Sequence, residues 1–149
     1  MTTLSHTDFQ AWLDRYVAAW KSYDPQAIGD LFSTDATYRY HPEDEPLRGR
    51  DAIVADWIRD QDQQGEYDAR YEPLAIDASN GNHVASGWTR YFTSGGDLKD
   101  EYWNIYLVTF DEAGQATAFT EWWIRDREFA HMARIAEVDR ALAKAAGSA

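Results

Sequence analysis

Apolar residues at the start of the chain recur at steps of three and four positions. This spacing predicts an amphipathic first helix, whose buried face would contain Phe9, Trp12, Leu13, Tyr16, Val17 and Trp20. Asp24 followed by Pro25 is typical of a helix start, because aspartate caps free backbone N–H groups and proline fits the first turn. We therefore expect a short second helix after Asp24, which forms a helical hairpin with the first.

The next stretch gives strand, loop and helix signals in turn. Residues 36–40 are rich in strand formers, whereas residues 42–46 contain two prolines and three acids and cannot continue a strand. After Gly49, the apolar residues of the segment 51–60 fall on one side of a helix. The sequence thus predicts one strand, a loop and a third helix.

From Tyr67 onward the period of the apolar pattern changes to two, which is typical of strands. Turn sequences divide this part into four predicted strands, over residues 67–76, 83–93, 99–110 and 115–125. Residues 128–146 return to helical spacing and predict a last helix, whose apolar stripe needs a surface on the same subunit or on a neighbour. Helices followed by a long meander predict an α+β fold, in which one strongly bent sheet wraps over the helices.

The composition narrows the possible partners. At 149 residues the chain has the length of one domain, and it contains no cysteine for a disulfide or a thiolate site. Its 26 acidic residues against 14 basic residues give a net charge of −12, which repels nucleic acid and anionic membrane surfaces. There is no long apolar run, and the N-terminus does not resemble a secretion signal. We therefore expect a cytoplasmic protein with neither nucleic acid nor membrane as a partner.

Several short sequence motifs occur along the chain in a characteristic order. They are Asp14-Arg15-Tyr16, Leu31-Phe32-Ser33-Thr34-Asp35-Ala36-Thr37, His41-Pro42, Gly49-Arg50-Asp51-Ala52-Ile53, Thr109-Phe110-Asp111-Glu112-Ala113-Gly114 and Glu121-Trp122-Trp123. Together with the order of predicted elements, this set resembles the nuclear transport factor two-like superfamily, whose enzymatic members include ketosteroid isomerases and SnoaL-like polyketide cyclases. The resemblance implies a cone-shaped domain over residues 1–126, with a curved antiparallel sheet around the N-terminal helices. Residues 127–149 are then a helical extension, packed on the domain or on a partner subunit.

The resemblance also suggests where a catalytic site would lie. In ketosteroid isomerases, a tyrosine and a protonated aspartic acid donate hydrogen bonds to the developing oxyanion, and a carboxylate removes the proton. When the short motifs are matched to that family, Tyr16 takes the position of the tyrosine, His41 that of the base and Tyr106 that of the second donor. Only Tyr16 keeps the residue type of that family. The substitutes are chemically competent, because an imidazole accepts a proton near neutral pH and phenols donate to an enolate.

The last predicted hairpin gives a second argument for a site. If the turn at residues 111–114 pairs Phe110 with Gln115, then Asn104 lies opposite Glu121. The same pairing places four aromatic residues on this face, namely Tyr102, Tyr106, Phe119 and Trp123. Such a face suits a mostly apolar cavity with a few polar groups, whereas a shift of one residue would turn the opposite face inward.

In the strand predicted over residues 83–93, the family pattern directs Trp88 and Arg90 inward. Arg90 and Asn104 would then orient Glu121, and the charge of Arg90 would neutralise it. The other side of the sheet would face outward and offer a dimer contact, with Thr89, Tyr91, Thr109 and Thr117 on it.

The candidate catalytic residues also have structural interpretations. Tyr16 would then be a core residue of the first helix, and His41 a solvated loop residue beside acidic neighbours. Glu121 would be part of a structural ion pair or an exposed carboxylate on the outer face. If Glu121 is instead buried in a cavity, its pKa is raised, as a general acid or base requires.

The sequence thus predicts a small enzyme for proton transfer on a hydrophobic cyclic molecule, through isomerisation, cyclisation or dehydration. Glu121 or His41 would remove the proton, and Tyr16 and Tyr106 would hold the oxyanion. The cavity would be lined by Trp57, Trp88, Tyr102, Phe119 and Trp123. No metal and no organic cofactor are predicted, because the histidines lack paired ligand spacing and no cofactor fingerprint occurs. The alternatives are a module that binds a ligand without chemistry and a domain for assembly, and we expect a homodimer.

Overall fold

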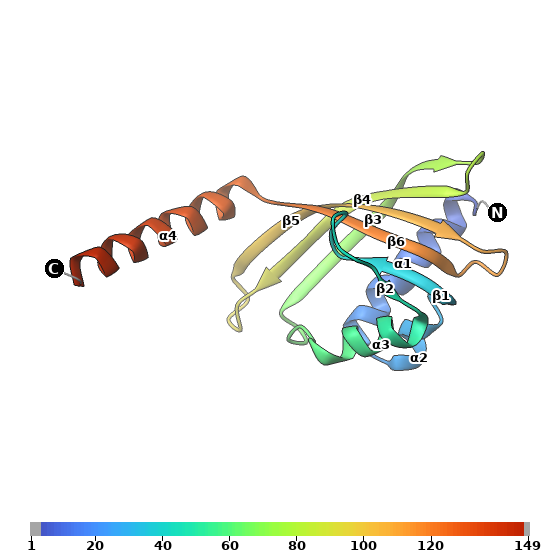
Figure 1. Cartoon of the computed structure of the whole chain (residues 1–149), viewed down its shortest axis with the longest axis horizontal. Helices are drawn as coiled ribbons and strands as arrows, with labels where there is room; N and C mark the ends of the chain where they lie inside the picture. The colour runs from blue at the N-terminus through green and yellow to red at the C-terminus, as the bar shows by residue number, and fades with distance from the viewer. Residues whose placement is uncertain (1–3, 148–149) are drawn as a thin grey trace.

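The computed structural model describes residues 4–147 and has the predicted α+β architecture (Figure 1). Its helices are α1 (His6–Ser22), α2 (Pro25–Gly29), α3 (Arg50–Arg59) and α4 (Arg127–Gly147). Its strands are β1 (Phe32–Arg39), β2 (Leu47–Arg48), β3 (Tyr67–Asp77), β4 (Asn82–Phe92), β5 (Leu98–Phe110) and β6 (Ala116–Arg125). The first three helices cover one face of a curved sheet, and α4 lies apart from it.

Side-chain caps explain where the first two helices begin. The Ser5 hydroxyl accepts a hydrogen bond from the backbone N–H of Asp8, and the Asp8 carboxylate accepts from the Ser5 N–H, which forms a capping box. Asp24 caps α2 through the N–H groups of Gln26 and Ala27, with proline in the first turn. The helical hairpin predicted from the sequence is therefore held by local bonds at both starts.

The six strands form one sheet in the order β2-β1-β6-β5-β4-β3. The pairs β3–β4, β4–β5 and β5–β6 are antiparallel, as a meander requires. The predicted sheet was antiparallel throughout, but β1 runs parallel to β6. β1 also begins at Phe32, four residues before the predicted start, and the polar residues of this irregular first part are partly exposed.

The concave face holds the hydrophobic core at one end and a cavity at the other, and the two halves of α1 lie one at each end. The N-terminal half of α1 buries Phe9, Trp12 and Leu13, and Phe110 meets both Phe9 and Trp12 edge to face at ring distances of 5.6 and 5.2 Å. The C-terminal half of α1 turns Tyr16 towards the remaining space under the sheet, where the candidate site lies.

Helix α4 projects from the end of β6 and buries none of its side chains (Figure 1). Its predicted apolar stripe is exposed at Met132, Ile135 and Leu142, and Val138 of the same helix is exposed as well. The homodimer expected from this stripe stays a prediction. None of the helices within residues 4–147 is long and apolar enough to span a membrane.

Candidate functional site

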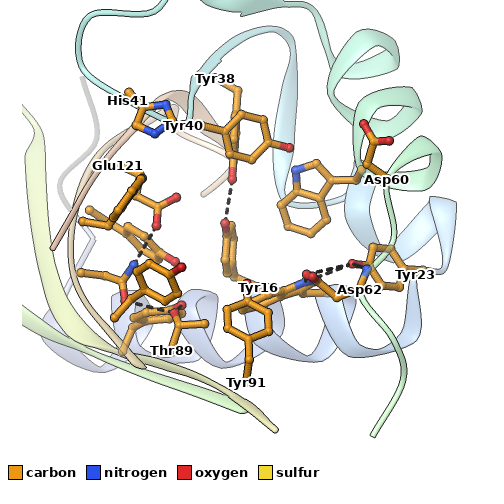
Figure 2. Close-up of a pocket in the computed structure, with 17 residues that line it drawn as sticks. Tyr16, Tyr23, Tyr38, Tyr40, His41, Asp60, Asp62, Thr89, Tyr91 and Glu121 are labelled. Carbon is orange, nitrogen blue, oxygen red and sulfur yellow. Dashed lines mark hydrogen bonds between the residues drawn. The ribbon is translucent and has the colours of Figure 1, made fainter. Parts of the chain in front are cut away.

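A cavity of about 410 Å³ opens on the concave face of the sheet, beside the C-terminal half of α1 (Figure 2). Its polar lining consists of His41, Asp60, Asp62, Thr89, Asn104 and Glu121. The rest is aromatic, namely Tyr16, Trp20, Tyr23, Tyr38, Tyr40, Trp57, Tyr71, Tyr91, Tyr102, Tyr106 and Trp123. This is the makeup of a ligand site, because aromatic walls enclose a small number of polar groups.

Most of the residues selected from the sequence come together around this cavity. Eight of them line it: Tyr16, His41, Trp57, Tyr102, Asn104, Tyr106, Glu121 and Trp123. A ninth, Phe119, is fully buried behind the wall, where it stacks on Tyr38 and Tyr16 at ring distances of 4.5 and 5.4 Å. Phe119 therefore supports the tyrosines of the cavity rather than lining it.

The placement predicted for Trp88 and Arg90 is wrong. Both lie on the convex face of the sheet, where the Arg90 guanidinium sits 4.0 Å from the centre of the Trp88 ring. Arg90 Nε donates to Glu101 Oε2 at 2.5 Å, so Arg90 pairs with a carboxylate of its own face and does not neutralise Glu121.

The inward side of β4 is instead the one that the sequence reading had placed outside. Thr89 and Tyr91 line the cavity and offer no outer dimer contact. Gly87 explains the choice of side, because a Cβ there would lie 2.4 Å from Cδ1 of Tyr71 and 2.0 Å from the backbone oxygen of Arg70. The small residues Ala85 and Gly87 thus mark the crowded concave side, a signal that was available in the sequence.

The register of the last hairpin differs from the prediction by two residues. Glu121 pairs with Tyr106 instead of Asn104, because the β5–β6 register shifts next to Phe110. Side chains alternate with a period of two, so this shift leaves Glu121 and Tyr106 on the predicted face. Glu121 lies in the cavity for that reason, although its cross-strand partner was misassigned.

Glu121 ends a directed chain of hydrogen bonds that runs across four strands, β3 to β6. Asn104 Nδ2 donates to Glu121 Oε1 at 2.7 Å, and Thr89 Oγ1 donates to Asn104 Oδ1 at 3.0 Å. Since the single Thr89 proton is used there, the Tyr71 hydroxyl at 2.5 Å must be the donor to Thr89. The chain fixes Oε1 of Glu121 as an acceptor and leaves Oε2 for a ligand.

Burial raises the pKa of Glu121 from its usual 4.5 to about 7. The hydrogen bond from Asn104 and the charge of His41 act in the opposite direction but do not cancel the effect of burial. A carboxyl group with this pKa both accepts and releases a proton near neutral pH, as acid–base catalysis requires.

Tyr16 and Tyr38 form a hydroxyl pair in the middle of the cavity lining, with their oxygens 2.7 Å apart (Figure 2). Burial raises the pKa of both phenols well above the usual value, so both keep their protons. One proton is used within the pair, and the other is free to be donated to a ligand. The pair can therefore act as a hydrogen-bond donor beside Glu121.

His41 lies at the same end of the cavity as Glu121 (Figure 2). Its side chain is 40% exposed, and its Nδ1 lies 3.1 Å from Asp44 Oδ2. Its ring packs 5.4 Å from that of Trp123, which is itself 43% exposed. His41 thus belongs to the mouth of the cavity, while Glu121 is closer to the phenols inside.

Trp57 contributes an unusual group to the lining. Its side chain is 6% exposed and packs edge to face against Tyr16 at 5.1 Å, yet its buried Nε1–H has no hydrogen-bond partner within residues 4–147. A buried donor without an acceptor costs free energy, so such groups are rare and call for an explanation. The sequence predicted Trp57 only as a flat wall.

The sequence reading missed the far end of the cavity and part of its middle. The missed lining residues are Trp20, Tyr23, Tyr38, Tyr40, Asp60, Asp62, Tyr71, Thr89 and Tyr91. Tyr38 could have been found from the alternation in β1, where it follows Ala36 by two residues and is buried on the same side of the strand. Asp60 and Asp62 lie at and after the end of α3, where no pattern predicts a direction. No group of three or more histidine or acidic residues within residues 4–147 is arranged to hold a metal ion.

Comparisons with known proteins agree with this architecture. One solved structure, a domain of unknown function with a cystatin-like fold from Nostoc punctiforme, aligns over 99% of this chain and 98% of its own with a TM-score of 0.68 and 18% identity. An LEH-like epoxide hydrolase from M. tuberculosis aligns over 80% of this chain and 84% of its own, with a TM-score of 0.58 and 14% identity. An NTF-2 like protein of unknown function from Burkholderia xenovorans aligns over 78% of this chain and 83% of its own, with a TM-score of 0.58 and 14% identity.

A search of curated protein sequences finds no match. The SnoaL-like domain family, in contrast, matches residues 13–132, which include every residue of the cavity lining. The chain therefore belongs to the SnoaL-like domain family.

Proposed function

We propose that the protein is an enzyme that transfers a proton on a small molecule bound in this cavity, with Glu121 as the catalytic base. The observation that carries the proposal is the position of Glu121, whose partly buried carboxyl group lies beside phenolic donors and has a pKa of about 7. The fold alone does not specify a reaction, since the same architecture hosts many activities. The site residues supply the argument.

The proposed reaction begins with a carbonyl compound. Oε2 of ionised Glu121 takes a proton from the carbon next to the carbonyl group, and the electron pair of that C–H bond moves to form an enolate. The oxyanion receives a hydrogen bond from the Tyr16–Tyr38 pair and a second one from Nε1–H of Trp57. Glu121 then returns its proton to another atom of the substrate. Isomerisation, cyclisation and dehydration of a cyclic substrate all follow this scheme.

The cavity also supports a second reaction, in which Glu121 removes a proton from water instead of from a C–H group. One structural neighbour is described as an LEH-like epoxide hydrolase, and a base beside hydrogen-bond donors is what addition of water to an epoxide requires. This second candidate keeps Glu121 as the base and changes only the group it acts on. Incorporation of ¹⁸O from labelled water into a product would identify it.

The test uses 5-nitrobenzisoxazole, whose ring opens when one C–H proton is removed. We expect saturable ring opening by the protein, with a rate that rises with pH through a midpoint near pH 7 to a plateau at higher pH, because only ionised Glu121 accepts the proton. Glu121→Gln should lower this rate about 100-fold or more, within the usual contribution of a positioned base. Glu112→Gln, the same change at an exposed turn residue, should leave it unchanged.

Equal rates for Glu121→Gln and the wild type would remove Glu121 from the mechanism. They would favour the alternative of a cavity that binds a ligand without chemistry. The binding of a neutral aromatic molecule such as benzyl alcohol, measured by tryptophan fluorescence, shows whether the cavity is intact in each variant.

A further inference from the structure

The charged groups that line the cavity are mostly acidic. Three carboxylates line it, Glu121, Asp60 and Asp62, and no lysine or arginine does. Asp60 is already paired with the exposed Arg59 at 2.8 Å. Asp62 has no ion pair within residues 4–147 and lies at the opposite end of the cavity from Glu121 (Figure 2). A ligand therefore meets a negative cavity with one unneutralised carboxylate at each end.

Asp62 is held in one orientation by its neighbours. Trp20 Nε1 donates to Asp62 Oδ2 at 3.0 Å, and the Tyr23 hydroxyl lies 3.5 Å from the same oxygen. The backbone N–H of Asp62 donates in turn to the Tyr23 hydroxyl at 2.8 Å. Both side-chain contacts use Oδ2, so Oδ1 remains available as an acceptor.

Aromatic rings surround this carboxylate. Trp20, Tyr23 and Tyr91 line the same end of the cavity, and Tyr67 packs behind them, 4.7 Å from the Trp20 ring and 6.4 Å from the Tyr91 ring. Aromatic faces attract cations, most strongly where water is excluded. Carboxylate and rings together form a site that suits a positively charged nitrogen and repels an anion.

Two further observations support ligand binding in this cavity. The buried Nε1–H of Trp57 has no partner within residues 4–147, and an acceptor on a ligand would satisfy it. Burial raises the pKa of Asp62, and burial together with the nearby carboxylates of Asp62 and Glu121 raises the pKa of Tyr91. Among residues 4–147, the cavity lining contains no lysine or arginine, and His41 lies at the Glu121 end.

We propose that the substrate carries a basic nitrogen, which binds as a cation to Oδ1 of Asp62 between the rings of Trp20, Tyr23 and Tyr91. The substrate class is then a cyclic amine or an amine-bearing cyclic carbonyl compound, with its cationic end at Asp62 and its reacting end at Glu121. This inference rests on the proposed function for the orientation of the ligand. The cation site itself does not need Glu121 to be a base.

The test compares three soluble probes of similar size: benzylamine as a cation, benzyl alcohol as a neutral molecule and benzoate as an anion. Binding is followed at pH 8 by the fluorescence of the cavity tryptophans. We expect benzylamine to bind about tenfold more tightly than benzyl alcohol, and benzoate more weakly than either. Equal affinities for the three probes in the wild type would overturn the inference.

Variants locate the effect. Asp62→Asn keeps an acceptor for Trp20 and should reduce the preference for benzylamine to less than about threefold, with unchanged affinity for benzyl alcohol as the sign of an intact cavity. Asp97→Asn removes the same charge from an exposed turn outside the cavity and should keep the preference. If Asp62→Asn does not fold, Tyr91→Leu on β4 is the second variant and should weaken the preference about threefold.

Glu121→Gln separates this inference from the proposed function. If the preference persists in Glu121→Gln while ring opening of 5-nitrobenzisoxazole is lost, both proposals stand. If ring opening is unaffected but the preference depends on Asp62, only the base assignment fails. If Glu121→Gln abolishes the preference and Asp62→Asn does not, the cation sits at Glu121 and the Asp62 site is wrong.

Discussion

The two faces of the sheet are both rich in aromatic residues, but they use them differently. On the concave face the rings are mostly tyrosines, whose hydroxyls take part in hydrogen bonds such as Tyr16–Tyr38 and Tyr71–Thr89. On the convex face they are tryptophans, and Trp103 and Trp122 are 47% and 41% exposed. The convex face also pairs its own charges, Arg90 with Glu101 and Arg70 with Glu72.

The difference teaches where chemistry is possible in this fold. A carboxylate such as Glu101 on the convex face has a cation beside it and forms an ion pair. Glu121 on the concave face has an amide and phenols beside it instead, and its pKa rises to about 7. Glu121 thus lacks the cationic partner that Glu101 has on the other face, and alternation along each strand decides which face a carboxylate joins.

The largest expected effect concerns the support of the concave face. Phe119→Ala should lower the free energy of unfolding by about 3 to 5 kcal/mol, because Phe119 is fully buried and stacks on Tyr38 and Tyr16. Trp122→Ala on the convex face should cost about 1 kcal/mol, since much of that ring already contacts water. Urea unfolding of both variants checks the difference, and equal losses would show that the faces are packed alike.

The next effect is the cost of ionising Glu121. Its pKa is about 7 in the folded chain and near 4.5 when unfolded, so between these values the folded state holds a proton that the unfolded state has released. The free energy of unfolding therefore falls as pH rises through this range, by up to about 3 kcal/mol. Glu121→Gln removes this loss and should be more stable than the wild type at pH 8 but not at pH 4.

Urea unfolding at the two pH values measures this difference directly. Asp62 has a raised pKa as well, but it contributes equally to both proteins and cancels in the comparison. Glu112→Gln at an exposed turn should follow the wild type at both pH values. A stability difference that does not change with pH would mean that Glu121 is ionised throughout, as it would be on the convex face.

The elements were predictable because each has a local cause. The apolar spacing of α1, the Asp24–Pro25 start of α2 and the period of two in the meander all depend on near neighbours in the chain. The face of Glu121 was predictable too, since a register error of two residues does not change the side on which a residue lies.

The remaining part of the site depends on contacts between distant segments. The side of β4 that faces inward is set by the approach of Tyr71 to Gly87, a contact between strands that the sequence indicates only through the small size of Ala85 and Gly87. Asp62 reaches the cavity through bonds to Trp20 and Tyr23, about 40 residues earlier in the chain. Tertiary contacts of this kind leave no period in the sequence, so the Asp62 end of the cavity was invisible there.

A smaller effect is expected from the unpaired donor of Trp57. Trp57→Phe removes a buried N–H without an acceptor, so the free energy of unfolding should stay within about 1 kcal/mol of the wild-type value although the residue is buried. Acetophenone, which offers a carbonyl acceptor, should bind to Trp57→Phe about fivefold more weakly than to the wild type. The convex control is Trp103→Phe, which loses the bond to Asp126 but leaves acetophenone binding unchanged. Equal acetophenone binding by Trp57→Phe and the wild type would leave that N–H without a role in binding.

The smallest effect is expected at Arg90. The residue lies on the convex face, is partly exposed and pairs with Glu101, so Arg90→Gln should cost no more than about 1 kcal/mol of stability. Its charge faces away from the cavity, and the midpoint of the pH–rate profile with 5-nitrobenzisoxazole should therefore stay near pH 7 in this variant. Had Arg90 neutralised Glu121, its removal would raise that midpoint by a unit or more, since a neighbouring cation lowers the pKa of a carboxyl group. An unmoved midpoint would thus show by measurement that the sheet separates the two charges.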